Sequence, residues 1–189
     1  MMKTVDVRFS DETIQTIQTL VGQEFDGMKH DPFIHVPSVY GIVGLFIGGK
    51  AYKLTNLIEV LDYYGQKEDV AVFHFVPTTP DSIKTFMDDG EMIDFPVCSC
   101  IKEVRIINEN QRLYYKGEQT YDVYTVRGLI FVLEDGREIS FEKPIWFSEE
   151  IYIQKGYDLI EKFSPTDEFG EGWEGDYRGE CSRDIVTIK

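Results

Sequence analysis

Residues 121–147 read YDVYTVRGLIFVLEDGREISFEKPIWF, and this stretch does most to decide the fold. Two strand-like segments lie on either side of Asp135-Gly136. An Asp-Gly pair in this setting favours a two-residue type I′ turn, because its twist matches that of the flanking strands. The stretch therefore predicts an antiparallel hairpin. The expected cross-strand pairs are Glu134 with Arg137, Val132 with Ile139, and Ile130 with Phe141.

The opposite face of this hairpin is half apolar and half acidic. Leu129, Phe131 and Leu133 lie on one strand, and Glu138, Ser140 and Glu142 on the other. Apolar side chains on both faces are typical of a strand that is buried twice. The second face therefore needs a cover, which either the acidic C-terminal segment or a partner can provide.

The rest of the chain is also rich in strand-forming residues. Its 189 residues are 42% hydrophobic and 14% aromatic, which is enough for a packed core and excludes disorder of the whole chain. We predict an α+β fold dominated by antiparallel sheet, a meander or partial barrel, with an N-terminal amphipathic helix and one or two short helices. Residues 1–90 form an N-terminal α+β half and residues 91–189 a β-rich half, and the two can be a single domain.

The predicted N-terminal helix covers Asp11 to Glu24. Ser10 is a suitable N-cap, acidic residues occupy the first turn, and apolar residues follow at helical spacing. Phe25 to Pro37, which contains Gly27 and two prolines, is predicted to be a loop.

The charge balance restricts the possible partners. The formal net charge is −15, and no basic run offsets it. Phosphate backbones and anionic membranes are repelled by such a surface, which leaves a basic partner, a cation or simple solubility. The N-terminus lacks the apolar core of a signal peptide, and no apolar run is long enough for a membrane helix. We expect a cytoplasmic protein; the oligomeric state stays open.

Two sets of side chains have the chemistry of metal ligands. His30, Asp31 and His35 lie within one short loop, which gives a weak alternative metal site without a recognised spacing. Cys98 and Cys100 are separated by one residue, and Cys181 is distant. Three cysteines do not form a disulfide framework and lack a fourth zinc ligand, so buried free thiols are the favoured interpretation. No cofactor is predicted.

The acidic segment, residues 161–180, is the main candidate for binding. It holds seven carboxylates and two cations, with aromatic residues among them. This composition is that of a contact for a basic partner, and the alternative is a solvated loop whose aromatics pack on the sheet. The predicted contact residues are Glu168, Glu171, Trp173, Glu174, Asp176 and Tyr177.

No catalytic motif is present, and catalytic residues stay unknown. The leading hypothesis is a non-catalytic protein-binding or inhibitor-like module, such as an immunity protein, for a basic partner. One alternative is a metal-dependent enzyme that uses His30, Asp31 and His35. Another is a structural or accessory subunit of an assembly.

Overall fold

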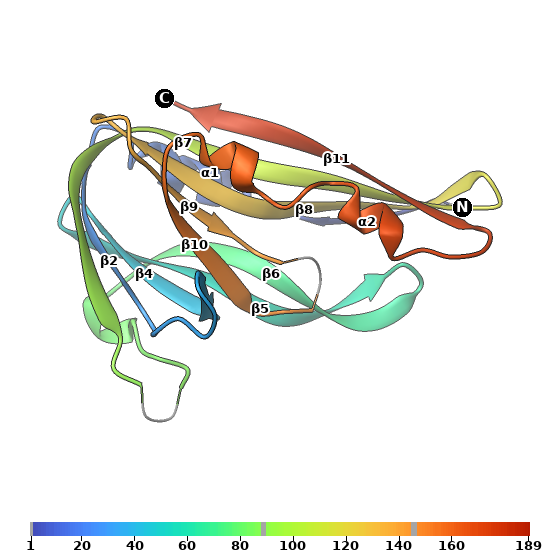
Figure 1. Ribbon diagram of the computed structural model, residues 1–189, viewed down its shortest axis with the longest axis horizontal. Helices are drawn as coiled ribbons and strands as arrows, with labels where there is room; N and C mark the ends of the chain where they lie inside the picture. The colour runs from blue at the N-terminus through green and yellow to red at the C-terminus, as the bar shows by residue number, and fades with distance from the viewer. Residues whose placement is uncertain (1, 88–89, 145–146) are drawn as a thin grey trace.

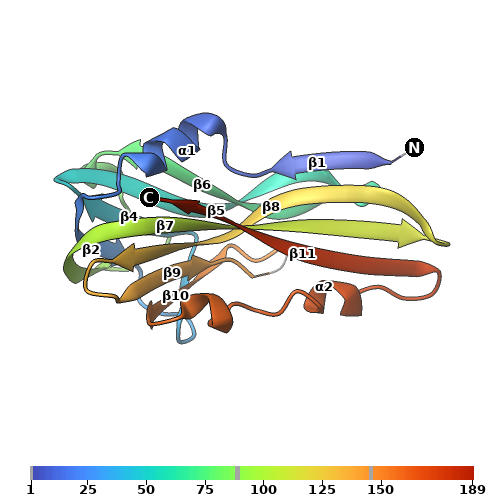
Figure 2. The same ribbon diagram turned by 90° about the horizontal axis from the view of Figure 1, so that it is seen from above.

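The structure is a computed structural model that describes residues 2–87, 90–144 and 147–189. The molecule is elongated, and two β-layers face each other (Figures 1 and 2). Its elements are β1 (Lys3–Val7), α1 (Asp11–Gln18), β2 (Glu24–His30), β3 (Ser38–Tyr40), β4 (Ile42–Ile47), β5 (Lys50–Tyr63), β6 (Gln66–Thr78), η1 (Pro80–Ser82), β7 (Ile93–Tyr115), β8 (Glu118–Leu133), β9 (Glu138–Glu142), β10 (Glu150–Gly156), η2 (Leu159–Lys162), α2 (Glu168–Glu171) and β11 (Tyr177–Ile188), where η marks a 3₁₀ turn.

The long strand β7 connects the two layers. Its residues 93–100 pair with β2, and its residues 101–115 pair with β8. The strand order is β3-β10-β9-β8-β7-β2-β4-β5-β6, with β1 added to β8 and β11 added to β7. Side chains of both layers, among them Leu54, Phe75, Phe131 and Phe141, meet in one apolar core. The strong bend of β7 therefore lets a single sheet bury its own inner face.

The chain is a mostly antiparallel β-protein, with 61% of its residues in strands and 10% in helices. The predicted α+β class is therefore wrong, although the dominance of antiparallel pairing is confirmed. The predicted partial barrel does not form either, because the sheet stays open. Only one helix, α1, is longer than a single turn in the described residues, and it has eight residues.

Helix α1 begins at the predicted residue but ends early. The Ser10 hydroxyl accepts a hydrogen bond from the Thr13 amide at 3.2 Å, as an N-cap should. The end of the expected helix is taken by strand pairing. Gly22 has a positive φ of 79° and donates its amide to Ile101 in β7 at 2.8 Å, and Glu24 already belongs to β2.

The predicted loop from Phe25 to Pro37 is wrong over its first part, because residues 24–30 form β2 between β4 and β7. Gly27 was interpreted as a loop signal. In the structure it permits a close approach of strands at a bulge, since a Cβ at this position would lie 2.9 Å from the backbone oxygen of Phe95.

The hairpin of β8 and β9 is confirmed, but its turn and its register differ from the prediction. The Gly136 amide donates to the Leu133 oxygen at 3.0 Å, and only Gly136 in the turn has a positive φ. This is a three-residue loop with a left-handed glycine rather than a two-residue type I′ turn. The pairs are Phe131 with Ile139, Leu129 with Phe141, and Val132 with Glu138. The shift by one residue turns Leu129 and Phe131 toward the main core.

The other face of the hairpin is covered from within the chain. Ile130 and Val132 pack against Leu159 and Phe163, which belong to η2 and the residue after it. The Leu159 amide also donates to the Glu138 carboxylate at 2.7 Å. The chain thus covers the face that carries Ile130 and Val132, whereas the face that was predicted to need a cover, with Leu129 and Phe131, lies in the main core.

The division into halves 1–90 and 91–189 stays a prediction. Residues 88 and 89, near that boundary, lie outside the described residues, as do residues 145 and 146 of the stretch 121–147. No helix within the described ranges is long and apolar enough to cross a membrane.

Candidate functional site

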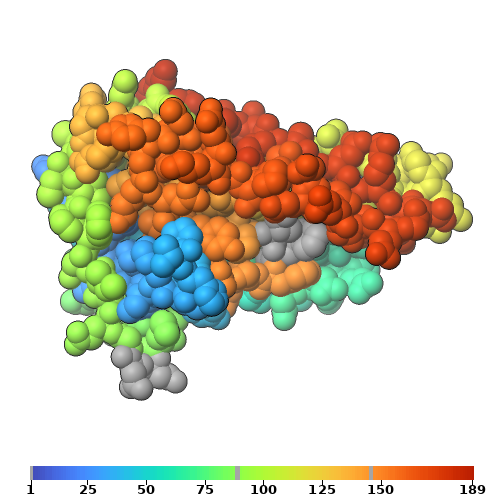
Figure 3. Space-filling model, in the orientation of Figure 1, coloured from blue at the N-terminus to red at the C-terminus, as the bar shows by residue number. Residues whose placement is uncertain are grey.

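The acidic segment lies beside the β5–β6 turn, at the end of the molecule that also carries the β7–β8 turn. In Figure 3 its red-orange residues run next to the teal residues of β5 and β6. Glu168 and Glu171 lie on α2, Trp173, Glu174 and Asp176 follow it, and Tyr177 begins β11. Trp173 is half-buried, and the other five predicted contact residues are exposed. The structure therefore brings these residues to one surface.

Aromatic rings from distant parts of the chain meet under this segment. The ring of Trp173 lies 5.1 Å from that of Tyr64 in an edge-on arrangement, and 5.8 Å from that of Phe169. Tyr64 also contacts Tyr63 and Tyr121, at 4.4 Å and 5.5 Å between ring centroids. Phe169 is fully buried, so the segment is anchored to the sheet by its aromatics while its carboxylates face solvent.

A pocket of about 250 Å³ opens beside Trp173. Its walls come from the β5–β6 turn, from the end of α2 and from the chain just before β10. The lining residues are Tyr63, Tyr64, Gln66, Glu68, Phe147, Gly172 and Trp173. Aromatic rings thus form most of the wall, and Glu68 supplies the only charged side chain among these residues.

The carboxylates around the pocket differ in their pairing. Asp176 lies 3.7 Å from Lys116, and Glu180 lies 2.5 Å from Arg178. Within the described residues, Glu168, Glu171 and Glu174 have no ion pair or hydrogen-bond partner for their side chains, and the same holds for Glu68. The unpaired negative charge is therefore concentrated next to Trp173.

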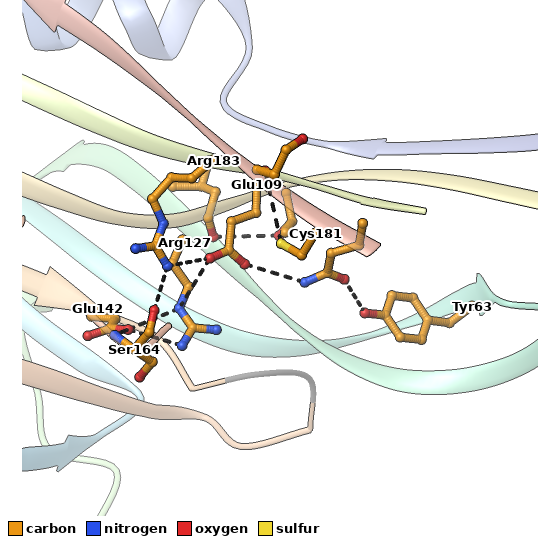
Figure 4. Close-up of polar contacts among 11 residues, drawn as sticks. Tyr63, Glu109, Arg127, Glu142, Ser164, Cys181 and Arg183 are labelled. Carbon is orange, nitrogen blue, oxygen red and sulfur yellow. Dashed lines mark hydrogen bonds and ion pairs between the residues drawn. The ribbon is translucent and has the colours of Figure 1, made fainter. Parts of the chain in front are cut away.

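The two tyrosines of the pocket wall are held from behind by buried polar groups, and Figure 4 shows those behind Tyr63. The hydroxyl of Tyr63 donates to Gln111 Oε1 at 2.7 Å, and that of Tyr64 lies 3.3 Å from the same oxygen. Gln111 in turn reaches Glu109, which accepts a hydrogen bond from Arg183 at 2.7 Å. The orientation of both rings is therefore set by the interior of the protein.

This buried network continues to the start of the acidic segment. Arg127 is buried and donates to Glu142 Oε1 at 3.0 Å, and the Ser164 amide donates to the same oxygen at 2.9 Å. Arg183 donates to the Ser164 carbonyl at 2.7 Å. These bonds tie the segment to β8, β9 and β11 at the point where it leaves η2.

Lys143 is a strongly perturbed titratable group of the interior. It is wholly buried, and its ammonium donates to the carbonyl of Ala71 at 2.7 Å. The pKa of Lys143 is lowered to about 7, mainly by desolvation and also by the nearby Arg127 charge, while Glu109 opposes both. A depressed lysine pKa often marks a catalytic site, but the adjoining cavity measures about 10 Å³. Because that holds one water molecule at most, no substrate can reach the amine there.

The residues of the predicted metal site do not converge. His30 is buried, stacks on Phe33 and bonds through Nδ1 to the backbone oxygen of Asp31 at 2.7 Å. Asp31 is fully buried, while His35 is exposed. His74 lies 2.7 Å from Glu59 on another strand. Within the described ranges, no three His, Cys, Asp or Glu side chains are placed to hold a metal ion.

The three cysteines are free, and two of the predicted buried thiols, Cys98 and Cys100, are exposed instead. Cys181 pairs with Gln111 across β7 and β11, eleven residues along β7 from Cys100. At about 3.3 Å per residue this is roughly 35 Å along the strand, so the cysteines do not meet. Burial raises the pKa of the Cys181 thiol to about 12, which keeps it protonated and unreactive.

The sequence pattern predicted Trp173 and its carboxylates as contact residues, which stays a prediction, and did not indicate Tyr63, Tyr64 and Glu68 as their neighbours. The consecutive tyrosines before Gly65 are visible in the sequence, but nothing local connects them to a segment about 100 residues away. Arg127 and Lys143 were also missed, although polar residues at 138, 140 and 142 hinted at a buried polar face.

Comparisons with protein-family models, curated proteins and solved structures gave no match to this chain.

Proposed function

We propose that the protein is a non-catalytic binding module that recognises a basic protein partner through the surface around Trp173. The observation that carries this proposal is the group of exposed, unpaired carboxylates Glu168, Glu171 and Glu174 beside an aromatic pocket. Aromatic anchors surrounded by charge are typical of protein contacts.

The charge of the whole chain supports the same partner. A net charge of −15 attracts a basic protein over several ångströms and raises its rate of association at low salt. Asp176 and Glu180 are already neutralised by nearby cations, so Glu168, Glu171 and Glu174 are the carboxylates free to pair with a partner.

The experiment removes only the unpaired charges. In one variant Glu168, Glu171 and Glu174 are replaced by Gln; in a control, the exposed Glu24, Glu91 and Glu134 are replaced by Gln, which changes the net charge equally at remote sites. Binding of a synthetic peptide with arginines spaced by glycine and serine is measured by calorimetry at several salt concentrations.

We expect the first variant to weaken binding by about three- to 150-fold, since each of the three exposed ion pairs contributes roughly 0.2–1 kcal/mol, and to show a shallower salt dependence. The control should retain nearly the full affinity. Equal weakening in both variants, or no binding by the unmodified protein, would contradict the proposed site.

A further inference from the structure

The size of the pocket beside Trp173 restricts what can enter it. Pockets for drug-sized ligands measure about 300–1,000 Å³. At about 250 Å³ this pocket is below that range and suits one long side chain or a fragment of similar size. The occupant is therefore a single group rather than a whole cofactor or an oligosaccharide.

The chemistry of the wall selects a cation. Tyr63, Tyr64, Phe147 and Trp173 present aromatic rings, whose faces are electron-rich and attract positive charge within about 6 Å of the ring centre. Among the residues that the structure describes, Glu68 adds a carboxylate without an internal partner, and none that lines the pocket is cationic. An anionic or purely apolar occupant would leave this carboxylate desolvated and unpaired.

The wall of the pocket is also preorganised for binding. Tyr64 has a positive φ of 54° at the β5–β6 turn, a conformation that costs a non-glycine residue free energy. Its ring packs against Tyr121, Phe169 and Trp173, and its hydroxyl lies beside Gln111. A tyrosine where a turn favours Asn, Asp or Gly shows that the ring is retained for its contacts rather than for the turn.

Among cationic side chains the pocket favours arginine over lysine. A guanidinium is planar, stacks on aromatic faces, is weakly hydrated and offers a fork of donors to a carboxylate. The two polar side chains of the wall, Glu68 and Gln66, lie two residues apart on β6 and present acceptor oxygens to such a fork. A lysine ammonium stacks less well on the flat rings than a guanidinium does, and it matches the two acceptor side chains less well.

We propose that this pocket binds one arginine side chain of the basic partner, with its guanidinium between the aromatic rings and the Glu68 carboxylate. This inference rests on the proposed function, and it makes that arginine the anchor of the contact. The carboxylates of Glu168, Glu171 and Glu174 then hold the flanking basic residues of the partner.

The test uses three capped pentapeptides that differ only in a central arginine, lysine or citrulline, the last being a neutral analogue of arginine. Binding to the full chain is followed by the indole ¹⁵N–¹H signal of Trp173 and by calorimetry. We expect the arginine peptide to bind at least tenfold more tightly than the citrulline peptide and severalfold more tightly than the lysine peptide.

A matched pair of variants locates the contact. Glu68→Gln removes the carboxylate of the pocket. Asp69→Asn removes the carboxylate of the next residue, which is exposed and lies on the other face of β6 because side chains alternate along a strand. We expect Glu68→Gln to lower the affinity for the arginine peptide by about tenfold and to reduce the preference over citrulline to the part that the aromatic rings supply, while Asp69→Asn leaves both unchanged. A normal thermal transition for both variants excludes unfolding as the cause.

The two proposals fail in different ways. If the multi-arginine peptide responds to the loss of Glu168, Glu171 and Glu174, but the pentapeptides show no preference for arginine or Glu68→Gln behaves like Asp69→Asn, the pocket assignment is overturned and the acidic surface stands. If no basic peptide binds the unmodified protein, both are overturned.

Discussion

The buried ammonium of Lys143 should make the stability of this protein depend on pH in a way that one substitution removes. The pKa of Lys143 falls from 10.5 to about 7 on folding. Between these values the unfolded chain binds more protons than the folded one, so the free energy of unfolding rises with pH. The penalty for burying this group is complete below about pH 7 and is gone above about pH 10.5.

The size of the effect follows from the shift. At 1.36 kcal/mol per pKa unit, the change from 10.5 to about 7 corresponds to about 5 kcal/mol, of which roughly half is recovered between about pH 6 and about pH 9. The Cys181 thiol, whose pKa rises from 9.0 to about 12, contributes the opposite slope at higher pH, so this window avoids it.

The assay is urea unfolding of the unmodified protein and of Lys143→Met, which retains the length of the side chain, across this pH range. Loss of the hydrogen bond to Ala71 lowers stability by a constant amount, so the informative quantity is the change with pH. The difference between the two proteins should shift by about 2–3 kcal/mol in favour of the unmodified protein as pH rises. The exposed Lys102→Met is the control. A difference that does not vary with pH would refute the assignment of a buried amine with a depressed pKa.

Three further substitutions test the packing. Arg127→Ala should lower the free energy of unfolding by about 3–5 kcal/mol in urea, because it leaves Glu142 buried without its cation. Adding Glu142→Leu should restore part of that loss. If the effects of the two substitutions simply add, the pairing of Arg127 with Glu142 is contradicted. Gly128→Ala should prevent folding or lower stability by more than about 3 kcal/mol, since its Cβ would lie 2.3 Å from a backbone oxygen of β9. Gly49→Ala, which has open space around it and a positive φ, should lower stability by only about 1 kcal/mol. Similar shifts of the thermal midpoint for the two variants would contradict this reasoning. Ser10→Ala should lower stability by about 1 kcal/mol through loss of the cap of α1, and no change in the unfolding midpoint would show that the cap is dispensable.

Local patterns were reliable where neighbouring residues decide the outcome. The hairpin at Asp135-Gly136 and the start of α1 at Ser10 were both predicted, because turn residues and caps act within a few positions. The same local logic failed for β2, whose Gly27 serves a contact with β7 that lies some 70 residues ahead.

In the hairpin of β8 and β9, a difference of one residue in the length of the loop changed the register of the whole strand pair. The third residue of the loop moved every cross-strand pair by one position, so that Leu129 and Phe131, rather than Ile130 and Val132, lie opposite Phe141 and Ile139. The Asp-Gly signal is compatible with both loops, and burial against the opposite layer selected the observed one.

By itself the sequence determined an acidic, strand-rich chain with a packed core, its hairpin at Asp135-Gly136, and a segment in which carboxylates surround Trp173. Only the tertiary structure decided that the sheet folds over at β7, that Arg127 and Lys143 are buried, and that Tyr63, Tyr64 and Glu68 complete a pocket with Trp173. The reason is physical: composition and turns act between neighbours in the chain, whereas strand pairing and burial depend on residues that are distant in sequence and meet only in the folded protein.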